Sequence, residues 1–478
     1  MKGLVDAGQR IDDKRRSKAI PMNDLLRNIP SVTELLESDE IQEVLQTTRS
    51  DLVVAAARTA LDQLRSAILA NDLHEVDVPL LIQSICQDVA TAGQSPLRSC
   101  INATGIILHT GLGRAPLAAQ ATAAMVEAGQ GYASVELNLA SGKRSQRVDA
   151  VERKLLQLFG GEAAAVVNNN AGATMLALAA LSSGKETVVS RGELVEIGGS
   201  FRMPDVMKMS QATLCEVGTT NKTRASDYEQ AIGENTAVLM KVHCSNYQIT
   251  GFSQTTTVEQ LVDVASRHDH VVVVDDIGSG ALYDYSQFGI QDEPLPAHSL
   301  QAGADVVLFS GDKLLGGPQC GIILGRKQSI AKISQHPMMR ALRLDKTILA
   351  ALSATLDLYC TPNPTDHVPV LQLLNAPLDE LQQRASNLAQ SINKIELLTA
   401  TVASDVTYLG GGSVPTQEIK TWTVSVSHEK LSHDELSEAL RAGELAVLGR
   451  IKQDEYRIDL RSIFAEQDDQ ILTAFQNI

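Results

Sequence analysis

The chain changes its hydrophobic pattern twice along its length. Residues 21 to about 90 carry apolar side chains three and four positions apart without strand-like alternation, which predicts helices. From about 100 to 365, short apolar runs alternate with helical stretches. The runs are AAAVV (163–167), TVVS (187–190), AVLMKVH (237–243), VVVVDD (271–276) and DVVLFS (305–310). Valine-rich runs separated by amphipathic helices are typical of a buried, mostly parallel sheet in an α/β domain.

The last hundred residues mix single helices and strands. A polar helix is predicted near 378–396, after a proline-rich boundary at 362–369, and TWTVSVS (421–427) alternates as a strand does. Ser432 and Glu435 have the spacing of a capping box, which predicts a helix start. We therefore expect three domains: a helical domain at 1–90, a large α/β domain at 91–365 and a small α+β domain at 366–478.

Composition limits the classes of protein that this chain can be. It has 57 acidic and 41 basic residues and a net charge of −16. A protein with this charge does not attract nucleic acid over its whole surface, but a local basic face could still bind it. The six cysteines show no CxxC pairing, and the amino terminus lacks the apolar stretch of a signal peptide. No apolar run reaches the roughly 18 residues of a membrane span. We expect a soluble cytoplasmic protein without a membrane segment or a metal site.

One lysine stands among glycines directly after a predicted strand. SGDKLLGGPQCG (310–321) follows ADVVLF and places Lys313 where an open α/β sheet presents its carboxyl ends to a ligand. Burial lowers the pKa of a lysine, and the free amine can form a Schiff base with an aldehyde. Taken alone, the motif also fits a solvated lysine in a surface turn. Other motifs in the sequence are needed to distinguish a reactive lysine from a solvated one.

Two neighbouring groups suit a phosphorylated aldehyde bound to this lysine. Ser310, three residues earlier, offers a hydroxyl to a phosphate. NNNAGAT (168–174) joins a strand to a helix, so the amides of Gly172 and Ala173 would face an anion at the helix N-terminus. An ordinary turn capped by asparagine is the alternative for this stretch.

A third group is the pair of carboxylates that ends VVVVDD. A carboxylate held against a pyridine nitrogen keeps that nitrogen protonated, which lets the ring withdraw electrons. Side chains alternate across a strand, so only one of Asp275 and Asp276 can face the ring; we prefer Asp276 because Gly278 follows it closely. Metal ligands or a hydrogen-bonded strand end are the alternatives. Together these motifs predict a pyridoxal-phosphate enzyme of fold type I, with a mostly parallel large domain, a small α+β carboxy-terminal domain and an extra helical amino-terminal domain.

Longer segments narrow the prediction to one family. INATGIILHTGLGRAPL (101–117), GYASVELNLASGKRSQR (131–147), RGELVEIGGSFRMPDVM (191–207) and SGDKLLGGPQCGII (310–323) resemble bacterial selenocysteine synthase, the L-seryl-tRNA(Sec) selenium transferase family. The resemblance implies that Lys313 carries pyridoxal 5'-phosphate and transfers protons. It also implies conversion of seryl-tRNA(Sec) to selenocysteinyl-tRNA(Sec) through a cofactor-bound aminoacrylyl intermediate, with selenophosphate as the selenium donor.

The resemblance further implies an anion site. Family positions for arginines that bind selenophosphate match Arg114, in HTGLGR, and the pair Arg340 and Arg343, in MMRALRLDK. Arginines three positions apart lie on one face of a helix, and guanidinium groups suit phosphate oxygens. Asp312 matches a family position that matters for the chemistry. His243, in KVHCSN, is assigned to the cofactor, with a hydrogen-bonded histidine at a strand end as the alternative.

Partners also follow from the resemblance. The helical amino-terminal domain would select seryl-tRNA(Sec) by shape, as double-stranded RNA is usually recognised. The chain would form a homo-oligomer, a decamer of five dimers with active sites at dimer interfaces. Similar proteins that lack the tRNA-binding domain are pyridoxal-phosphate lyases acting on a small amino acid or amino sugar acid, and this activity is the alternative. A non-catalytic tRNA-binding paralogue is disfavoured by Lys313, Asp276 and the three arginines.

Overall fold

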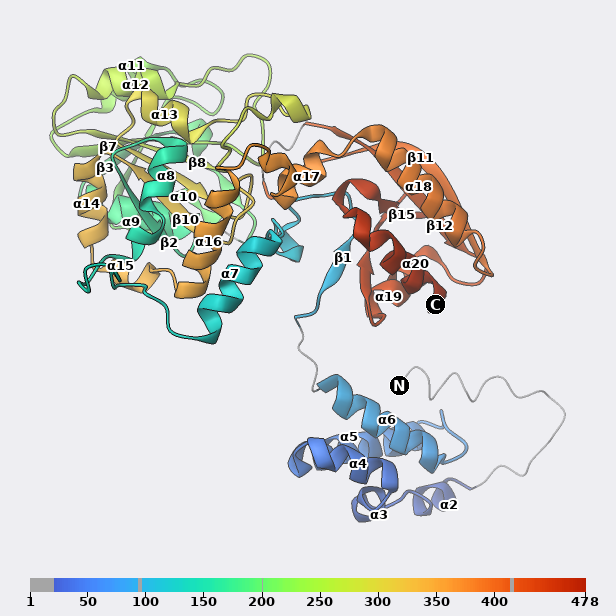
Figure 1. The fold of residues 1–478 in the computed structure, drawn as a ribbon. Helices are drawn as coiled ribbons and strands as arrows, with labels where there is room; N and C mark the ends of the chain where they lie inside the picture. The colour runs from blue at the N-terminus through green and yellow to red at the C-terminus, as the bar shows by residue number, and fades with distance from the viewer. Residues whose placement is uncertain (1–20, 93–96, 200, 413–416) are drawn as a thin grey trace. The chain divides into compact units, whose positions relative to one another are not determined.

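The computed structural model describes residues 21–92, 97–199, 201–412 and 417–478. The chain forms two compact units, Met1–Ser99 and Cys100–Ile478 (Figure 1). Across these described ranges, no helix combines the length and the apolar content needed to cross a membrane.

The amino-terminal unit is helical, as its hydrophobic pattern predicts. Its helices are α2 (Met22–Arg27), α3 (Val32–Leu36), α4 (Asp39–Thr47), α5 (Ser50–Leu69) and α6 (Val78–Ala92). Helix α3 begins with a capping box, in which Ser31 N donates to Glu34 Oε2 over 2.6 Å and Glu34 N donates to Ser31 Oγ over 3.2 Å. Leu61 of α5 and Ile85 of α6 belong to a core of this unit's own.

The large domain of the second unit is built on a seven-stranded sheet in the order β2-β10-β9-β8-β7-β3-β6. The strands are β2 (Ala163–Val167), β3 (Glu186–Ser190), β6 (Thr213–Val217), β7 (Thr236–Val242), β8 (Val272–Gly278), β9 (Val306–Ser310) and β10 (Gly321–Gly325). Only β10 runs antiparallel to its neighbours in this sheet. The mostly parallel sheet is confirmed, and each of the five predicted apolar runs overlaps a strand.

Helices cover both faces of this sheet (Figure 1). The helices of the domain are α7 (Ala119–Gln130), α8 (Glu152–Phe159), α9 (Asn170–Ser182), α10 (Met203–Met209), α11 (Ala225–Ala231), α12 (Val258–Ala265), α13 (Pro296–Ala302), α14 (Lys327–Gln335), α15 (Met338–Leu342), α16 (Lys346–Leu358) and α17 (Pro369–Asn375). Val273 packs with α8, α12 and α16, whereas Val274 packs with α9, α10 and α14. Burial of both faces explains why the strands read as continuous apolar runs. A short pair, β4 (Glu196–Ile197) and β5 (Phe201–Arg202), lies outside the sheet.

The small domain is an antiparallel sheet with helices, as predicted for an α+β segment. Its strands are β11 (Leu398–Thr407), β12 (Ile419–His428), β14 (Arg450–Lys452) and β15 (Glu455–Asp459), and its helices are α18 (Leu378–Ile392), α19 (His433–Ala442) and α20 (Asp468–Gln476). Glu435 N donates to Ser432 Oγ over 3.3 Å at the start of α19, so the predicted capping box is present.

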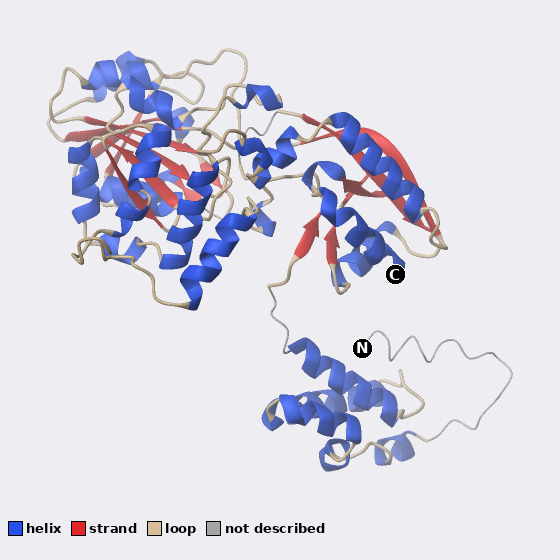
Figure 2. Ribbon diagram, in the orientation of Figure 1, coloured by secondary structure: helices blue, strands red, loops and turns tan. Residues whose placement is uncertain are grey.

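A segment that we expected in the large domain pairs with the small one. Strand β1 (Cys100–Asn102) lies parallel to β13 (Ala446–Leu448), in a two-stranded sheet apart from the large one (Figure 2). Ile101 is buried in the core of the small domain together with Val447. Residues 100–102, which we expected in the large domain, therefore pack with the small domain.

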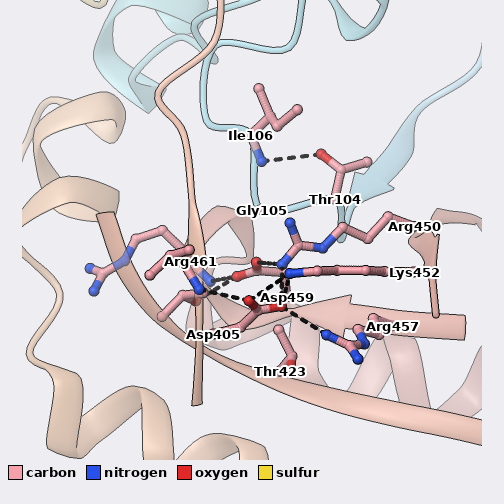
Figure 3. Close-up of polar contacts among 12 residues, drawn as sticks. Thr104, Gly105, Ile106, Asp405, Thr423, Arg450, Lys452, Arg457, Asp459 and Arg461 are labelled. Atoms are coloured by element: carbon pink, nitrogen blue, oxygen red, sulfur yellow. Dashed lines mark hydrogen bonds and ion pairs between the residues drawn. The ribbon is translucent and has the colours of Figure 1, made fainter. Parts of the chain in front are cut away.

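A network of charged residues joins this first segment to the small-domain sheet (Figure 3). Asp459 N donates to Ala103 O over 3.0 Å, and its Oδ2 accepts a hydrogen bond from Arg450 Nη2 over 2.8 Å. Asp405, in β11, also binds Arg450, over 3.0 Å. Gly105 has a φ of 85°, and a Cβ there would overlap the Asp459 carboxylate. The turn after β1 therefore needs a glycine for its conformation and for the space.

Candidate active site

A cavity of about 290 Å³ lies at the carboxyl ends of β7, β8 and β9 and at the start of α9. Side chains from all four elements line it, and a loop after β1 adds one more. Its lining includes Arg114, Asn169, Asn170, Ala171, His243, Asp276, Gly278, Ser310 and Lys313. Open α/β sheets bind ligands at this edge.

Lys313 lies in a tight turn just beyond β9. The turn is held because Leu314 N donates to Ser279 O over 3.0 Å and Gly316 N donates to Lys313 O over 2.9 Å. The lysine is 5% exposed. Burial, and then the charge of Arg114, lower the pKa of Lys313, while nearby carboxylates oppose the shift. A lysine in this setting gives up its proton more readily than one in water, as a nucleophilic amine requires.

The two carboxylates at the end of β8 point in different directions. Asp276 lines the cavity, and its two oxygens accept hydrogen bonds from Asn170 Nδ2 and from Thr174 Oγ1, each over 2.7 Å. Asp275 Oδ2 instead accepts from Ser299 Oγ, in α13, over 2.6 Å. The structure therefore brings Asp276 to Lys313 and turns Asp275 away.

Asn170 and Thr174 are partners of Asp276 that the sequence analysis missed. They lie four positions apart at the start of α9, so both face the same side of the helix. The signal for them was present in NNNAGAT, where an amide and a hydroxyl have this spacing.

The start of α9 exposes amides two residues earlier than we expected. Asn169 caps the helix: its Oδ1 accepts from Gly172 N over 2.8 Å, and its carbonyl accepts from Ala173 N over 3.0 Å. Both of those amides are therefore engaged within the first turn. The amides of Asn170 and Ala171 have no acceptor among the described residues, and both residues line the cavity. The first two residues of a helix are where an anion finds free donors.

Ser310 and His243 complete the walls near the lysine. Ser310 ends β9 and is almost fully buried. His243 follows β7, and its backbone N donates to Asp276 O over 2.9 Å. Burial, with the charges of Lys241 and Lys313, lowers the pKa of His243 to about 4. The imidazole is therefore neutral at physiological pH.

Arg114 enters the cavity from the turn after the 3-10 helix η1 (Thr110–Leu112). Its Nη1 lies 2.8 Å from Oδ2 of Asp312. The other oxygen of Asp312 is buried and has no hydrogen-bond partner in the described part of the chain. Arg114 has a φ of 63°, a left-handed conformation that strains a residue with a Cβ.

Arg340 and Arg343 line a second cavity, of about 710 Å³, together with Arg144 and Arg147. Glu136 lies among these arginines; its pKa is lowered chiefly by the hydrogen bond from Arg147. Arg343 does not belong to the helix that we expected to hold both arginines of the pair. Helix α15 ends at Leu342, and Arg343 is extended because it forms a β-bridge with Val167.

Within one chain, the structure does not place these two arginines in the cavity that holds Arg114 and Lys313. The three expected selenophosphate ligands are therefore divided between two cavities.

The groups around Lys313 fit pyridoxal 5'-phosphate. They comprise a buried amine, two free helix amides beside a hydroxyl, a carboxylate held by two donors, and a neutral imidazole. Asn170 Oδ1 is also buried without a hydrogen-bond partner among the described residues. In the same residues, no three His, Cys, Asp or Glu side chains are grouped as metal ligands.

Comparisons with known proteins find one family along most of the chain. Residues 100–464 match the family model of L-seryl-tRNA selenium transferase, and residues 26–65 match the model of the selenocysteine synthase N terminal region. An L-seryl-tRNA(Sec) selenium transferase of Hyphomonas neptunium (strain ATCC 15444) is 43% identical over 461 residues, which is 96% of this chain and 99% of the relative. One of Carboxydothermus hydrogenoformans is 42% identical over 451 residues, 93% of this chain and 96% of the relative.

A solved structure shares the fold. D-Glucosaminate-6-phosphate ammonia-lyase superposes with a TM-score of 0.56 at 22% identity, over 80% of this chain and 95% of the lyase. At this identity the likeness shows the fold alone. The two family models and the near-full-length relatives go further: this chain belongs to the L-seryl-tRNA selenium transferase family.

Proposed function

We propose that this enzyme converts seryl-tRNA(Sec) to selenocysteinyl-tRNA(Sec), with selenophosphate as the selenium donor and pyridoxal 5'-phosphate as the cofactor. The observation that carries the proposal is the match to selenium transferases along nearly the whole chain, the amino-terminal unit included. The buried Lys313, just beyond β9, also supports the proposal, because a pyridoxal-phosphate enzyme needs a lysine that can bind the cofactor covalently. Because aminoacyl-tRNA is a substrate of translation, we place the reaction in the cytoplasm.

Each wall of the Lys313 cavity would hold one part of the cofactor. Lys313 would bind its aldehyde carbon, Asp276 its ring nitrogen, and His243 the face of its ring. Ser310 and the first amides of α9 would bind its phosphate. When bound, pyridoxal 5'-phosphate supplies an electron sink that stabilises negative charge on the α-carbon of an attached amino acid.

The chain's own residues would then move protons and hold anions. Lys313, with its lowered pKa, would take the proton from the α-carbon of the seryl group and return a proton later. Asn170 and Thr174 would hold the Asp276 carboxylate in place by their hydrogen bonds. Arg114 would bind an oxygen of selenophosphate while Asp312 orients its guanidinium group.

The remaining arginines support the expected homo-oligomer. Arg340 and Arg343 lie in another cavity of the same chain, so a second copy would have to supply the pair if all three arginines bind one selenophosphate. This arrangement agrees with a decamer of five dimers that has its active sites between subunits. The amino-terminal helical unit would recognise seryl-tRNA(Sec) by shape.

The deciding experiment supplies the purified, cofactor-loaded protein with seryl-tRNA(Sec) and selenophosphate and measures selenocysteinyl-tRNA by mass spectrometry of the released amino acid. We expect product with the parent protein and none with Lys313→Ala, which also loses the visible absorbance of the bound cofactor. Lys332→Ala, an exposed lysine of α14, is the matched control and should keep both. Turnover of a free amino acid or amino sugar acid without any selenocysteinyl-tRNA would instead identify a lyase.

A further inference from the structure

A third cavity lies at the same edge of the large sheet as the Lys313 cavity. Its volume is about 380 Å³, and residues at the carboxyl ends of β3, β6 and β7 line it. These strands are parallel to β8 and β9, whose ends border the Lys313 cavity. Val242 and His243, at the end of β7, line both cavities. A molecule that is attached at Lys313 therefore has the third cavity as a direct neighbour.

Polar side chains make up much of the wall of the third cavity. Gln254 is exposed there, and its amide group can both donate and accept hydrogen bonds. Two lysines also line the cavity, but they differ in their partners. The ammonium of Lys241 is paired with the buried carboxylate of Glu193, whereas Lys222 has no carboxylate partner among the described residues. Lys222 is therefore the cation that a bound anion could use.

An aromatic side chain stands at the rim of this cavity. Phe252 directly precedes Ser253, which lines the cavity, and Phe252 is 81% exposed. The ammonium of Lys222 lies 3.2 Å from the centre of its ring. The backbone on both sides is braced, because Asn221 Nδ2 donates to Phe252 O over 2.6 Å and Gln254 N donates to Asn221 O over 2.9 Å. The ring is thus held beside a cation and an amide, while most of its surface is open to solvent.

The chemistry of the proposed substrate requires a nucleotide close to Lys313. Seryl-tRNA carries its serine on the ribose of the last nucleotide, so this nucleotide must lie within a few bonds of the reacting group. The acceptor end of a tRNA is unpaired, and its bases are free to stack. Proteins bind unpaired nucleotides by stacking the bases on aromatic rings and placing cations near the phosphates. Phe252, Lys222 and Gln254 supply a ring, a cation and a partner for a base edge.

We propose that the third cavity binds the unpaired acceptor end of seryl-tRNA. A base stacks on the face of Phe252 that Lys222 leaves open, Lys222 contacts a phosphate, and Gln254 hydrogen-bonds to the edge of a base. The ribose that carries the serine lies beside His243, from which the seryl group reaches Lys313. The inference rests on the proposed function and adds to it where the reacting end of the tRNA is held. The amino-terminal unit would recognise a different part of the same tRNA.

The first test locates the terminal base without any turnover. The cofactor-loaded full chain is mixed with tRNA(Sec) whose terminal adenine carries a photoreactive azide, and the complex is irradiated. Peptide mass spectrometry should find the crosslinks in residues 219–223 or 247–255, and excess unmodified tRNA(Sec) should suppress them. Crosslinks confined to other segments, such as those around Arg340 and Arg343, would overturn the inference. Failure of the full chain to bind tRNA(Sec) in a filter assay would instead overturn the proposed function.

The second test measures the contribution of the ring to substrate binding. Because loss of a stacked base weakens binding, Phe252→Ala should raise the KM for seryl-tRNA by about tenfold and leave kcat, the KM for selenophosphate and the cofactor absorbance unchanged. Phe252→Trp keeps an aromatic ring and should restore the KM. Met209→Ala, at an exposed apolar residue that ends α10, is the matched control and should behave as the parent does. An unchanged KM for seryl-tRNA in Phe252→Ala, or an equal rise for both substrates, would contradict the inference.

Discussion

Arg114 and Asp312 form an ion pair of 2.8 Å between the turn after η1 and the residue that precedes Lys313. The carboxylate is almost fully buried and the guanidinium is about three-quarters buried. The arginine proposed to hold selenophosphate therefore already compensates a buried negative charge. An arriving anion must share this cation with Asp312, which places the selenium donor next to the lysine.

Substitutions at Arg114 should separate the ion pair from the backbone strain. Arg114→Gly and Arg114→Ala both remove the partner of Asp312 and should cost about 2 kcal/mol of unfolding free energy. Because φ is 63° here, alanine keeps the strain and glycine relieves it, so the glycine variant should be more stable than the alanine variant by about 1 kcal/mol. Urea unfolding measures both. Equal stability of the two variants would show that the turn relaxes in solution.

The two neighbouring aspartates offer a matched test of the cofactor site. Asp276→Asn should reduce selenium transfer by roughly a hundredfold or more and alter the absorbance of the bound cofactor, because the carboxylate facing the cavity is lost. Asp275→Asn changes the side chain that bonds to Ser299 and should leave the absorbance intact. Single-turnover transfer and spectra of both variants check this. A larger effect of Asp275→Asn than of Asp276→Asn would mean that Asp275, and not Asp276, faces the cavity.

Asp275 also predicts a pH dependence of stability. Burial raises its pKa to about 7. Since this lies above the unfolded value of about 3.9, its contribution to stability is complete below about pH 4 and is lost as pH rises through about 7. The unfolding free energy of the parent minus that of Asp275→Asn should therefore decrease between about pH 4 and 7 and stay level above that. A difference that does not vary over this interval would contradict the raised pKa.

Deletion of residues 1–97 should preserve cofactor binding and weaken tRNA binding. The amino-terminal unit has its own core, whereas β1, which begins at Cys100, belongs to the core of the small domain and must be kept. We expect the truncated protein to keep the cofactor absorbance and to bind seryl-tRNA(Sec) at least about tenfold more weakly, a change of about 1.4 kcal/mol. Filter binding against the full chain measures this. Undiminished affinity would move tRNA recognition to the second unit.

Two glycines test the packing between the first segment and the small domain. Gly105→Ala would push a Cβ into the Asp459 carboxylate and should cost more than about 2 kcal/mol. Gly142→Ala is the control: its φ of 64° is also left-handed, but no atom lies within 4 Å of the added Cβ, so it should cost only about 1 kcal/mol. Thermal unfolding compares them. Similar losses of unfolding free energy in the two variants would show that the Asp459 side chain moves aside at little cost.

Local patterns predicted the features that depend on local physics. A strand that is buried on both faces has a continuous run of apolar residues, often valines. This pattern located β7, β8 and β9 in the sequence, and with them Asp276 and Lys313 near the strand ends. The anion-binding amides at the start of α9 were misplaced by two residues, because the cap, Asn169, accepts hydrogen bonds from the amides that we had assigned to an anion.

Features set by distant contacts could not be found in this way. Arg343 leaves the expected helix because Val167, far away in the chain, pairs with it. The division of the three arginines between two cavities also depends on contacts that hydrophobic periodicity does not record.

The pairing of Cys100–Asn102 with Ala446–Leu448 has a consequence for how the protein is made. On the ribosome, the first of these strands emerges early and must wait until almost the whole polypeptide has been translated before its partner exists. Domains that are contiguous in a gene can fold as they leave the exit tunnel. Here the carboxy-terminal lobe cannot complete its interior during synthesis, so nascent chains that stop short of residue 446 should be substrates for chaperones and proteases.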